Sequence, residues 1–245
     1  MVAKAAILLV TLFFCLPSAA FAASPQPARV IVAIVDTGVA QNRVTAPRLL
    51  PGWDFVDNDA NATDMNGHGS AMASIVLAQC QRCDILPVRV LGQGGMGTAT
   101  LVIEGIHYAV AHGARIINLS ITTPSDNPDL SAAVEWAVTQ GVAVVVAAGN
   151  SGLPDGYPAE TSPDAIAVAS VDATGALYAW SNHGPWVSVY APGSLLALTI
   201  AGKPMQAVGT SASAAYVTGK AGILLGYDPA LTPLELLGLL KQETY

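Results

Sequence analysis

The sequence predicts a three-layer α/β fold, in which a mostly parallel central β-sheet carries helices on both faces. Six apolar runs rich in β-branched residues are mostly continuous rather than alternating, as in strands buried on both faces of a parallel sheet. Helical patterns lie between these runs, and this alternation of strand and helix favours the α/β class. The sequence contains no internal repeat and no linker, so we expect a single domain over residues 23–245.

Local signals place the individual elements. The predicted strands lie at residues 29–35, 85–91, 114–119, 142–148, 165–171 and 186–190. The predicted helices lie at residues 98–112, 128–140 and 211–225, and a last one follows residue 232. Asn127 is a suitable cap before Pro128 in the first helical turn, and Thr232 and Glu235 form a capping box.

The N-terminal residues have the features of a secretion signal. Lys4 supplies a positive charge, residues 5–16 are apolar, and residues 20–22 form a small-x-small cleavage site. We therefore expect residues 1–22 to be removed and the mature protein to be secreted or periplasmic.

The composition excludes several classes of protein. Hydrophobic residues make up 52% of the chain and charged residues 11%, so the chain is neither disordered nor a charged linker. The formal net charge of −7 disfavours nucleic acid and anionic membrane surfaces as partners. After residue 25 no apolar stretch reaches the roughly 18 residues of a membrane span, so we expect no membrane anchor. We also expect a monomer.

Two cysteines follow the signal, in the motif Cys80-Gln-Arg-Cys83. In a cytosolic protein such a pair suggests a redox site or half of a zinc site. In an exported chain without a second pair, a small structural disulfide that closes a tight turn is the favoured interpretation.

A glycine-rich segment between a predicted strand and a predicted helix raises a dinucleotide-binding hypothesis. Gly92, Gly94 and Gly97 match the spacing G-x-G-x-x-G. Such a site also needs an acidic residue at the end of the next strand, and residues 116–123 contain none. We reject this hypothesis and expect the glycines to bring the backbone close to another group.

Four polar residues lie at positions where functional residues are expected in an open parallel sheet. Asp36 ends the first strand, where a carboxylate either has a partner or is a turn residue. His68 lies between two glycines, before a helix of small residues. Asn150 follows a buried strand, where its amide either stabilises an oxyanion or forms a turn. Ser211 opens the helix 211–225, where a hydroxyl is either a cap or a nucleophile. Their order along the chain is one of the known orders of a Ser-His-Asp triad.

The segments around these residues resemble the signature segments of the subtilisin-like serine protease family. VDTGV, NGHGS-MA, AAGN, SNHGP, YAPG and GTSAS occur in the family's order, and the resemblance covers nearly all of residues 29–226. The spacing is similar too, with 32 residues from Asp36 to His68 and 30 from Ser120 to Asn150. The resemblance implies a subtilisin-like fold and an endopeptidase that hydrolyses peptide bonds in protein or peptide substrates.

The resemblance also implies catalytic roles. Ser211 Oγ would attack the peptide carbonyl, His68 would accept and return the proton, and Asp36 would orient the imidazole. The Asn150 amide and the Ser211 N–H would hold the oxyanion. No cofactor is required for this chemistry.

Further residues acquire expected roles from the same resemblance. Two segments would flank the peptide as strands, namely Gly95-Met96-Gly97 and Ser120-Ile121-Thr122. Thr210 and Ser213 are expected to be hydroxyls of the helix start.

Four features depart from the family's pattern. No recognisable propeptide lies between the cleavage site and the first strand. Ala71 stands where the family has a histidine, and residues 212–216 replace the usual Met-Ala-Ser-Pro-His. Thr122 and Thr123 replace glycines beside the specificity pocket. The loop around Cys80 is too short for the family's strong calcium site.

A weaker calcium site remains an expectation. Asp54, Asp57 and Asp59 lie close together, as in a secondary calcium loop of some family members. Carboxylate oxygens in a flexible loop suit Ca²⁺, whereas a solvated acidic turn needs no ion.

Two other functions stay open from the sequence. A non-catalytic protein on the same fold would bind a peptide or partner, which the altered support residues motivate. A serine hydrolase acting on non-peptide esters is a third hypothesis, although the G-x-S-x-G motif of the usual esterase fold is missing.

Overall fold

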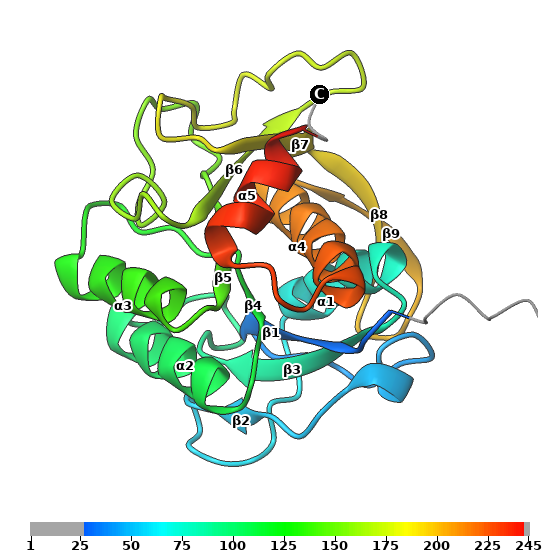
Figure 1. The fold of residues 1–245 in the computed structure, drawn as a ribbon. Coiled ribbons are helices and arrows are strands. Elements are labelled where there is room, and N and C mark those ends of the chain that lie inside the picture. The colour runs from blue at the N-terminus through cyan, green and yellow to red at the C-terminus, as the bar shows by residue number, and fades with distance from the viewer. Residues whose placement is uncertain (1–26, 243–245) are drawn as a thin grey trace, which may run out of the picture.

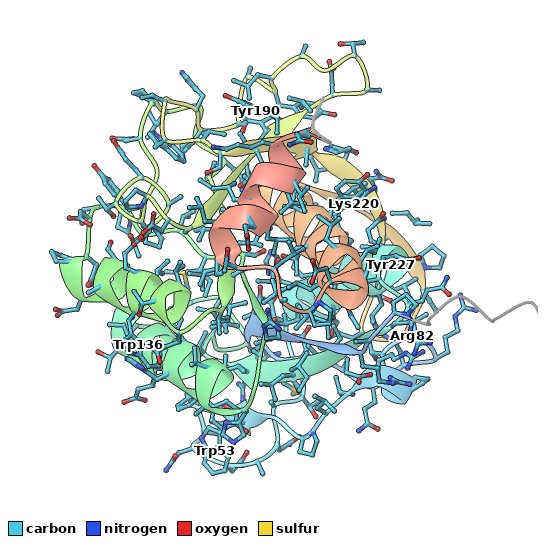
Figure 2. The ribbon with its side chains drawn as sticks, viewed as in Figure 1. Trp53, Arg82, Trp136, Tyr190, Lys220 and Tyr227 are labelled. Carbon is cyan, nitrogen blue, oxygen red and sulfur yellow. A yellow bond between two sulfur atoms is a disulfide. The ribbon has the colours of Figure 1, made fainter. Side chains whose placement is uncertain are left out.

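A seven-stranded parallel sheet forms the centre of the molecule in a computed structural model that describes residues 27–242 (Figure 1). The strand order is β2-β3-β1-β4-β5-β6-β7. These strands are β1 (Val30–Asp36), β2 (Trp53–Asp54), β3 (Cys83–Arg89), β4 (Ile116–Leu119), β5 (Ala143–Ala147), β6 (Ile166–Val171) and β7 (Val189–Pro192). Trp53 on β2 and Tyr190 on β7 mark the two edges of the sheet in Figure 2. The predicted signal, residues 1–22, lies outside the described residues.

Helices cover both faces of the sheet, which confirms the predicted fold class. The helices are α1 (His68–Gln79), α2 (Ala99–Ala111), α3 (Pro128–Thr139), α4 (Thr210–Tyr227) and α5 (Pro233–Gln242), with a short 3₁₀ turn at Ala46–Arg48. Successive side chains of β1 point to opposite faces. Val32 and Ile34 pack with α1, α4 and α5, while Ala33 and Val35 pack with α2 and α3. Within residues 27–242, no helix is both long and apolar enough to cross a membrane.

An antiparallel hairpin beside the sheet was not predicted. It comprises β8 (Ser194–Leu198) and β9 (Pro204–Val208), and β8 packs against α1. Several of its side chains are exposed, so its sequence lacks the continuous apolar run by which the buried strands are recognised. The last predicted sheet strand, 186–190, begins later in the structure, at Val189, where pairing with β6 starts.

A disulfide joins Cys80 and Cys83 between α1 and β3, as the sequence predicts. Helix α4 passes directly over it. A Cβ at Gly222 of α4 would lie 2.3 Å from the Cys83 sulfur, so only glycine permits this approach.

Candidate active site

The carboxyl ends of the strands and the starts of two helices bring the four candidate residues to one edge of the sheet. Asp36 is the last residue of β1, and Asn150 follows β5. His68 is the first residue of α1, and Ser211 is the second residue of α4. His68, Asn150 and Ser211 line one cavity of about 880 Å³.

His68, which lines this cavity, is paired with the buried Asp36 behind it. The Nδ1 atom of His68 lies 2.8 Å from Asp36 Oδ1 and 2.9 Å from Oδ2. The Asp36 side chain is fully buried, and its Oδ1 also accepts a hydrogen bond from the Thr37 N–H at 2.7 Å. Because the carboxylate holds Nδ1, the other ring nitrogen of His68 is left for a substrate or nucleophile.

Two glycines allow His68 to stand this close to β1. Gly67, which caps α1, has φ = +111°, a conformation that other residues rarely adopt. A Cβ at Gly69 would lie 2.2 Å from the Gly38 carbonyl oxygen and 3.2 Å from Asp36 Cβ. A side chain at Gly69 would therefore push α1 away from the end of β1.

A buried carboxylate that the sequence analysis missed, Asp64, holds the loop before α1. Its Oδ1 accepts hydrogen bonds from the N–H groups of Asn66 and Gly67, each at 2.8 Å, and from the Thr37 hydroxyl at 2.9 Å. Its Oδ2 accepts from the N–H and hydroxyl of Ser70, at 2.9 and 2.6 Å. The only local signal for this role is the turn-forming Asn-Gly pair that follows it.

The two carboxylates change the proton affinity of His68. Burial alone would lower the pKa of the imidazole. The charge of Asp36, its hydrogen bond and the charge of Asp64 outweigh burial and raise the pKa above the ordinary value of 6.5.

Side-chain hydrogen bonds tie the start of α4 to the end of β4. The Thr218 hydroxyl donates to Asn118 Oδ1, and Asn118 Nδ2 donates to Ser120 Oγ, each at 3.0 Å. The Ser120 hydroxyl in turn donates to the Ser211 carbonyl oxygen at 3.3 Å. Ser211 is thus held at a helix N-terminus, where unpaired N–H groups favour negative charge.

The orientation of the Asn150 amide is determined by Thr210. Asn150 Oδ1 accepts from the Thr210 N–H at 2.8 Å and from the Thr210 hydroxyl at 3.0 Å. Because a backbone N–H can only donate, the atom facing it must be the amide oxygen. The amide nitrogen of Asn150 is left as a donor beside Ser211.

Thr210 and Ser213 lie in the first turn of α4, as expected of helix-start hydroxyls, but neither of them caps the helix. Gly209 occupies the N-cap position of α4, and no side chain caps this helix. The Thr210 hydroxyl accepts from the Gly149 N–H at 3.0 Å while it donates to Asn150. The Ser213 hydroxyl bonds Ser170 Oγ at 2.8 Å, inside the core. Both hydroxyls form tertiary contacts that helix capping patterns do not reveal.

The two segments expected to flank a peptide lie on the other side of His68. Gly95, Gly97, Ser120, Ile121 and Thr122 line a second cavity, of about 390 Å³, together with His68. Neither segment is a strand in this structure, because strand formation needs a hydrogen-bonded partner and the two segments are not paired with each other or with the sheet. In residues 95–97 the Gly95 N–H donates to the Gly92 carbonyl oxygen and the Met96 carbonyl oxygen accepts from the Gly92 N–H, each at 2.9 Å, so a peptide would pair with the remaining backbone groups of the two segments.

Comparison with known proteins identifies the family to which this fold belongs. The family described as "Subtilase family" matches residues 28–244. The chain belongs to the subtilase family. It is therefore a subtilisin-like serine protease.

Individual relatives resemble this subtilase over most of its length. Thermitase of Thermoactinomyces vulgaris is 41% identical over 206 residues, which are 79% of this chain and 74% of thermitase. Subtilisin DY of Bacillus licheniformis is 34% identical over 220 residues, 84% of this chain and 80% of that protein. The crystal structure of a cold adapted subtilisin-like serine proteinase superposes with a TM-score of 0.83 at 33% identity, covering 87% of this chain and 81% of the other.

The loop that carries Asp54, Asp57 and Asp59 contains ion pairs to an arginine instead of three free carboxylates. Arg89, at the end of β3, is buried, and its Nη1 donates to Asp54 Oδ2 and, at 2.6 Å, to Asp57 Oδ2. The third carboxylate, Asp59, accepts from the Asn61 N–H at 2.8 Å. Within residues 27–242 no group of three acidic, histidine or cysteine residues could hold a metal ion. As arranged, the three aspartates do not fit a calcium ion.

Calcium binding at Asp54, Asp57 and Asp59 stays a prediction, and this arrangement weighs against it. Because Arg89 forms ion pairs with two of the carboxylates, we expect the same melting temperature in excess chelator and in millimolar calcium. An ion that bound only the folded state would raise the melting temperature by mass action. A calcium-dependent rise that Asp59→Asn removes would restore the metal site.

Replacing Arg89 should destabilise the fold strongly. In Arg89→Met the buried Asp54 carboxylate loses its cation, and leaving a buried charge unpaired costs about 3–5 kcal/mol. Chemical denaturation measures the loss. Arg29→Met is the matched control, because Arg29 pairs with Asp84 at the surface, where such a pair contributes at most about 1 kcal/mol. Equal losses for the two variants would contradict the role of Arg89.

Proposed function

We propose that this subtilase is a secreted serine endopeptidase that uses Asp36, His68 and Ser211 as its catalytic triad. The observation that carries the proposal is the buried Asp36 carboxylate on His68 Nδ1, with His68, Ser211 and Asn150 around one cavity. Secretion rests on the sequence of residues 1–22 alone. One chain supplies every residue of the site, so the proposal requires only a monomer.

The geometry supports the following sequence of events. His68 takes the proton from Ser211 as Oγ attacks the peptide carbonyl, and Asp36 stabilises the imidazolium that forms. The Asn150 amide nitrogen and the Ser211 N–H donate to the oxyanion. His68 then gives its proton to the leaving amine, and water hydrolyses the acyl-enzyme by the same steps. No cofactor takes part.

The substrate backbone is expected to pair with the two segments that line the second cavity. Residues 95–97 and 120–122 would each form hydrogen bonds to an extended peptide between them, so that affinity comes from the main chain. A third cavity, of about 320 Å³, lies beside Asn150 and is lined by Thr122, Thr123 and Tyr157. It is positioned to receive the side chain on the acyl side of the cleaved bond.

Covalent labelling tests the proposal directly. A fluorophosphonate probe reacts with a serine that an adjacent base activates, so the mature protein should label and Ser211→Ala should not. Ser125→Ala, which removes an exposed serine outside the three cavities, should label fully. A non-catalytic peptide-binding protein would show no labelling in any of these proteins.

The pH dependence of catalysis should follow His68. Only the neutral imidazole accepts a proton, so kcat/KM should rise with pH, with a midpoint above 6.5 because the pKa is raised. The stability of the fold changes with pH in the opposite direction to kcat/KM. The protonated pair stabilises the fold below pH 6.5, and this contribution is lost as the pH rises through the folded-state pKa.

A nuclear magnetic resonance titration of His68 in inactive Ser211→Ala isolates the cause. Replacing Asp36 with asparagine leaves burial in place but removes the main charge, so the His68 pKa should fall below that of the parent. Asp64→Asn should lower the His68 pKa by less than Asp36→Asn does. A pKa that does not change in Asp36→Asn would contradict the pairing.

A further inference from the structure

The cavity of about 880 Å³ lies on the side of His68 opposite the expected peptide-pairing segments. It is more than twice the size of the cavity lined by those segments, which is about 390 Å³. It lies between the starts of α1 and α4 and the β8–β9 hairpin. Its volume is within the range of a site that encloses a ligand group.

The lining of this cavity is mostly apolar. Besides the proposed reacting groups, its polar members are the uncharged residues Asn66, Thr199 and Gln206. Met72 and three alanines, Ala71, Ala207 and Ala212, form buried walls. Ile200 and Met205 of the hairpin stand at the rim, 37% and 38% exposed. The described lining residues include no aspartate, glutamate, lysine or arginine.

Two of the alanines explain why this space is open. Ala71 lies one turn after His68, and Ala212 directly follows Ser211. Both positions depart from the family's usual larger residues, histidine and methionine. The cavity therefore reaches the bases of the two helices that carry His68 and Ser211.

The order of bond making and breaking in the proposed mechanism determines which half of a substrate lies in this cavity. Ser211 keeps the acyl half during the reaction, and the acyl half lies along residues 95–97 and 120–122 in the proposed function. His68 protonates the leaving amine, which must therefore lie on the other side of the imidazole. That side is the large apolar cavity.

We infer that this subtilase selects its substrates on the leaving-group side, through a large apolar side chain on the residue that follows the cleaved bond. The inference rests on the proposed function. Burying a phenylalanine or leucine side chain in such a cavity is worth roughly tenfold to a hundredfold in binding compared with glycine.

Acyl transfer to added amines measures this preference separately from the acyl side. A peptide ester forms the acyl-enzyme, and its alcohol leaves. An amino acid amide then attacks the ester carbonyl, so that a C–N bond forms, the bond to Ser211 Oγ breaks, and the amine proton passes through His68 to Oγ. The ratio of aminolysis to hydrolysis reports how well each amine occupies the leaving-group side. The nucleophiles are phenylalanine amide, leucine amide, glycine amide and aspartate amide.

We expect phenylalanine amide and leucine amide to be captured at least about tenfold better than glycine amide, and aspartate amide to be captured worst. Met205→Glu and Ile200→Glu each place a charge at the rim and should reduce the preference to less than about threefold. Leu196→Glu is the matched control, because Leu196 lies on the same hairpin, is exposed, and does not line the cavity. It should retain the preference of the parent protein.

Two kinds of failure are distinguishable. If the ester is hydrolysed and the fluorophosphonate labels Ser211, but all four amides are captured equally, the inference is wrong and the proposed function stands. The inference is also wrong if Leu196→Glu loses the preference as fully as Met205→Glu and Ile200→Glu. Absence of both ester hydrolysis and labelling overturns the proposed function and the inference together.

Discussion

Replacing Ser211 with alanine should lower kcat for peptide hydrolysis by about 10⁶, the size measured when subtilisin loses its nucleophile. The reason is that, in the proposed mechanism, Ser211 Oγ forms the bond to the substrate, and alanine supplies no nucleophile in its place. His68→Ala should cause a similar loss, because its imidazole, held by the buried Asp36, is the base in the proposed mechanism.

The double variant Ser211→Ala/His68→Ala tests whether the two residues act together as parts of a triad or contribute to catalysis independently. Ser211 and His68 act in one step, so removing both should cost no more than removing either one. His112→Ala is a matched control, since His112 is exposed at the end of α2 and bonds only its own helix. Melting curves should show that every variant is folded. Wild-type turnover in folded His68→Ala would contradict the assignment.

Replacing Asn150 with alanine should lower kcat by about 10²–10³ with little change in KM, the size measured when subtilisin loses its oxyanion asparagine. The amide nitrogen is left as a donor because Thr210 holds the amide oxygen. It acts on charge that develops only during the reaction, so substrate binding in the ground state should change little. Turnover is measured per active site, by titration with a fluorophosphonate.

The alternative is that Asn150 is only a turn residue. The variant Asn150→Asp distinguishes this role from that of an oxyanion donor. A carboxylate at this position still accepts from the Thr210 N–H and hydroxyl, so the melting temperature should stay close to that of the parent. The donor is lost, however, and kcat should fall at least as far as in Asn150→Ala. Thr210→Val removes one of the two hydrogen bonds to the amide, together with the bond from the Gly149 N–H, and should lower kcat about tenfold. Full kcat with a lowered melting temperature in Asn150→Ala would support the turn role.

The residues of the candidate site could be found in the sequence because each carries a local signal. Asp36 and Asn150 directly follow buried strands, and residues at such positions meet at one edge of a parallel sheet. Glycines flank His68, and Ser211 begins a helix of small residues. Asp64 and Thr210 lacked such signals, because their partners are defined by tertiary contacts. The partners of Thr210, Gly149 and Asn150, lie about 60 residues earlier in the chain.

The sequence by itself determined the layered fold of this protein and the edge at which its chemistry lies. Burial on both faces leaves a continuous apolar pattern in each strand, and the pattern can be read without knowing the strand's neighbours. Only the tertiary structure decided the partner of each buried polar group. Arg89 lies 35 residues after Asp54 in the chain, and no pattern in either segment predicted their ion pair. The cavity of about 880 Å³ likewise exists only where the β8–β9 hairpin meets the start of α1, more than 120 residues earlier in the chain. Periodicity reports whether a side chain is buried, whereas pairing and cavity shape arise from segments that approach each other only when the chain has folded.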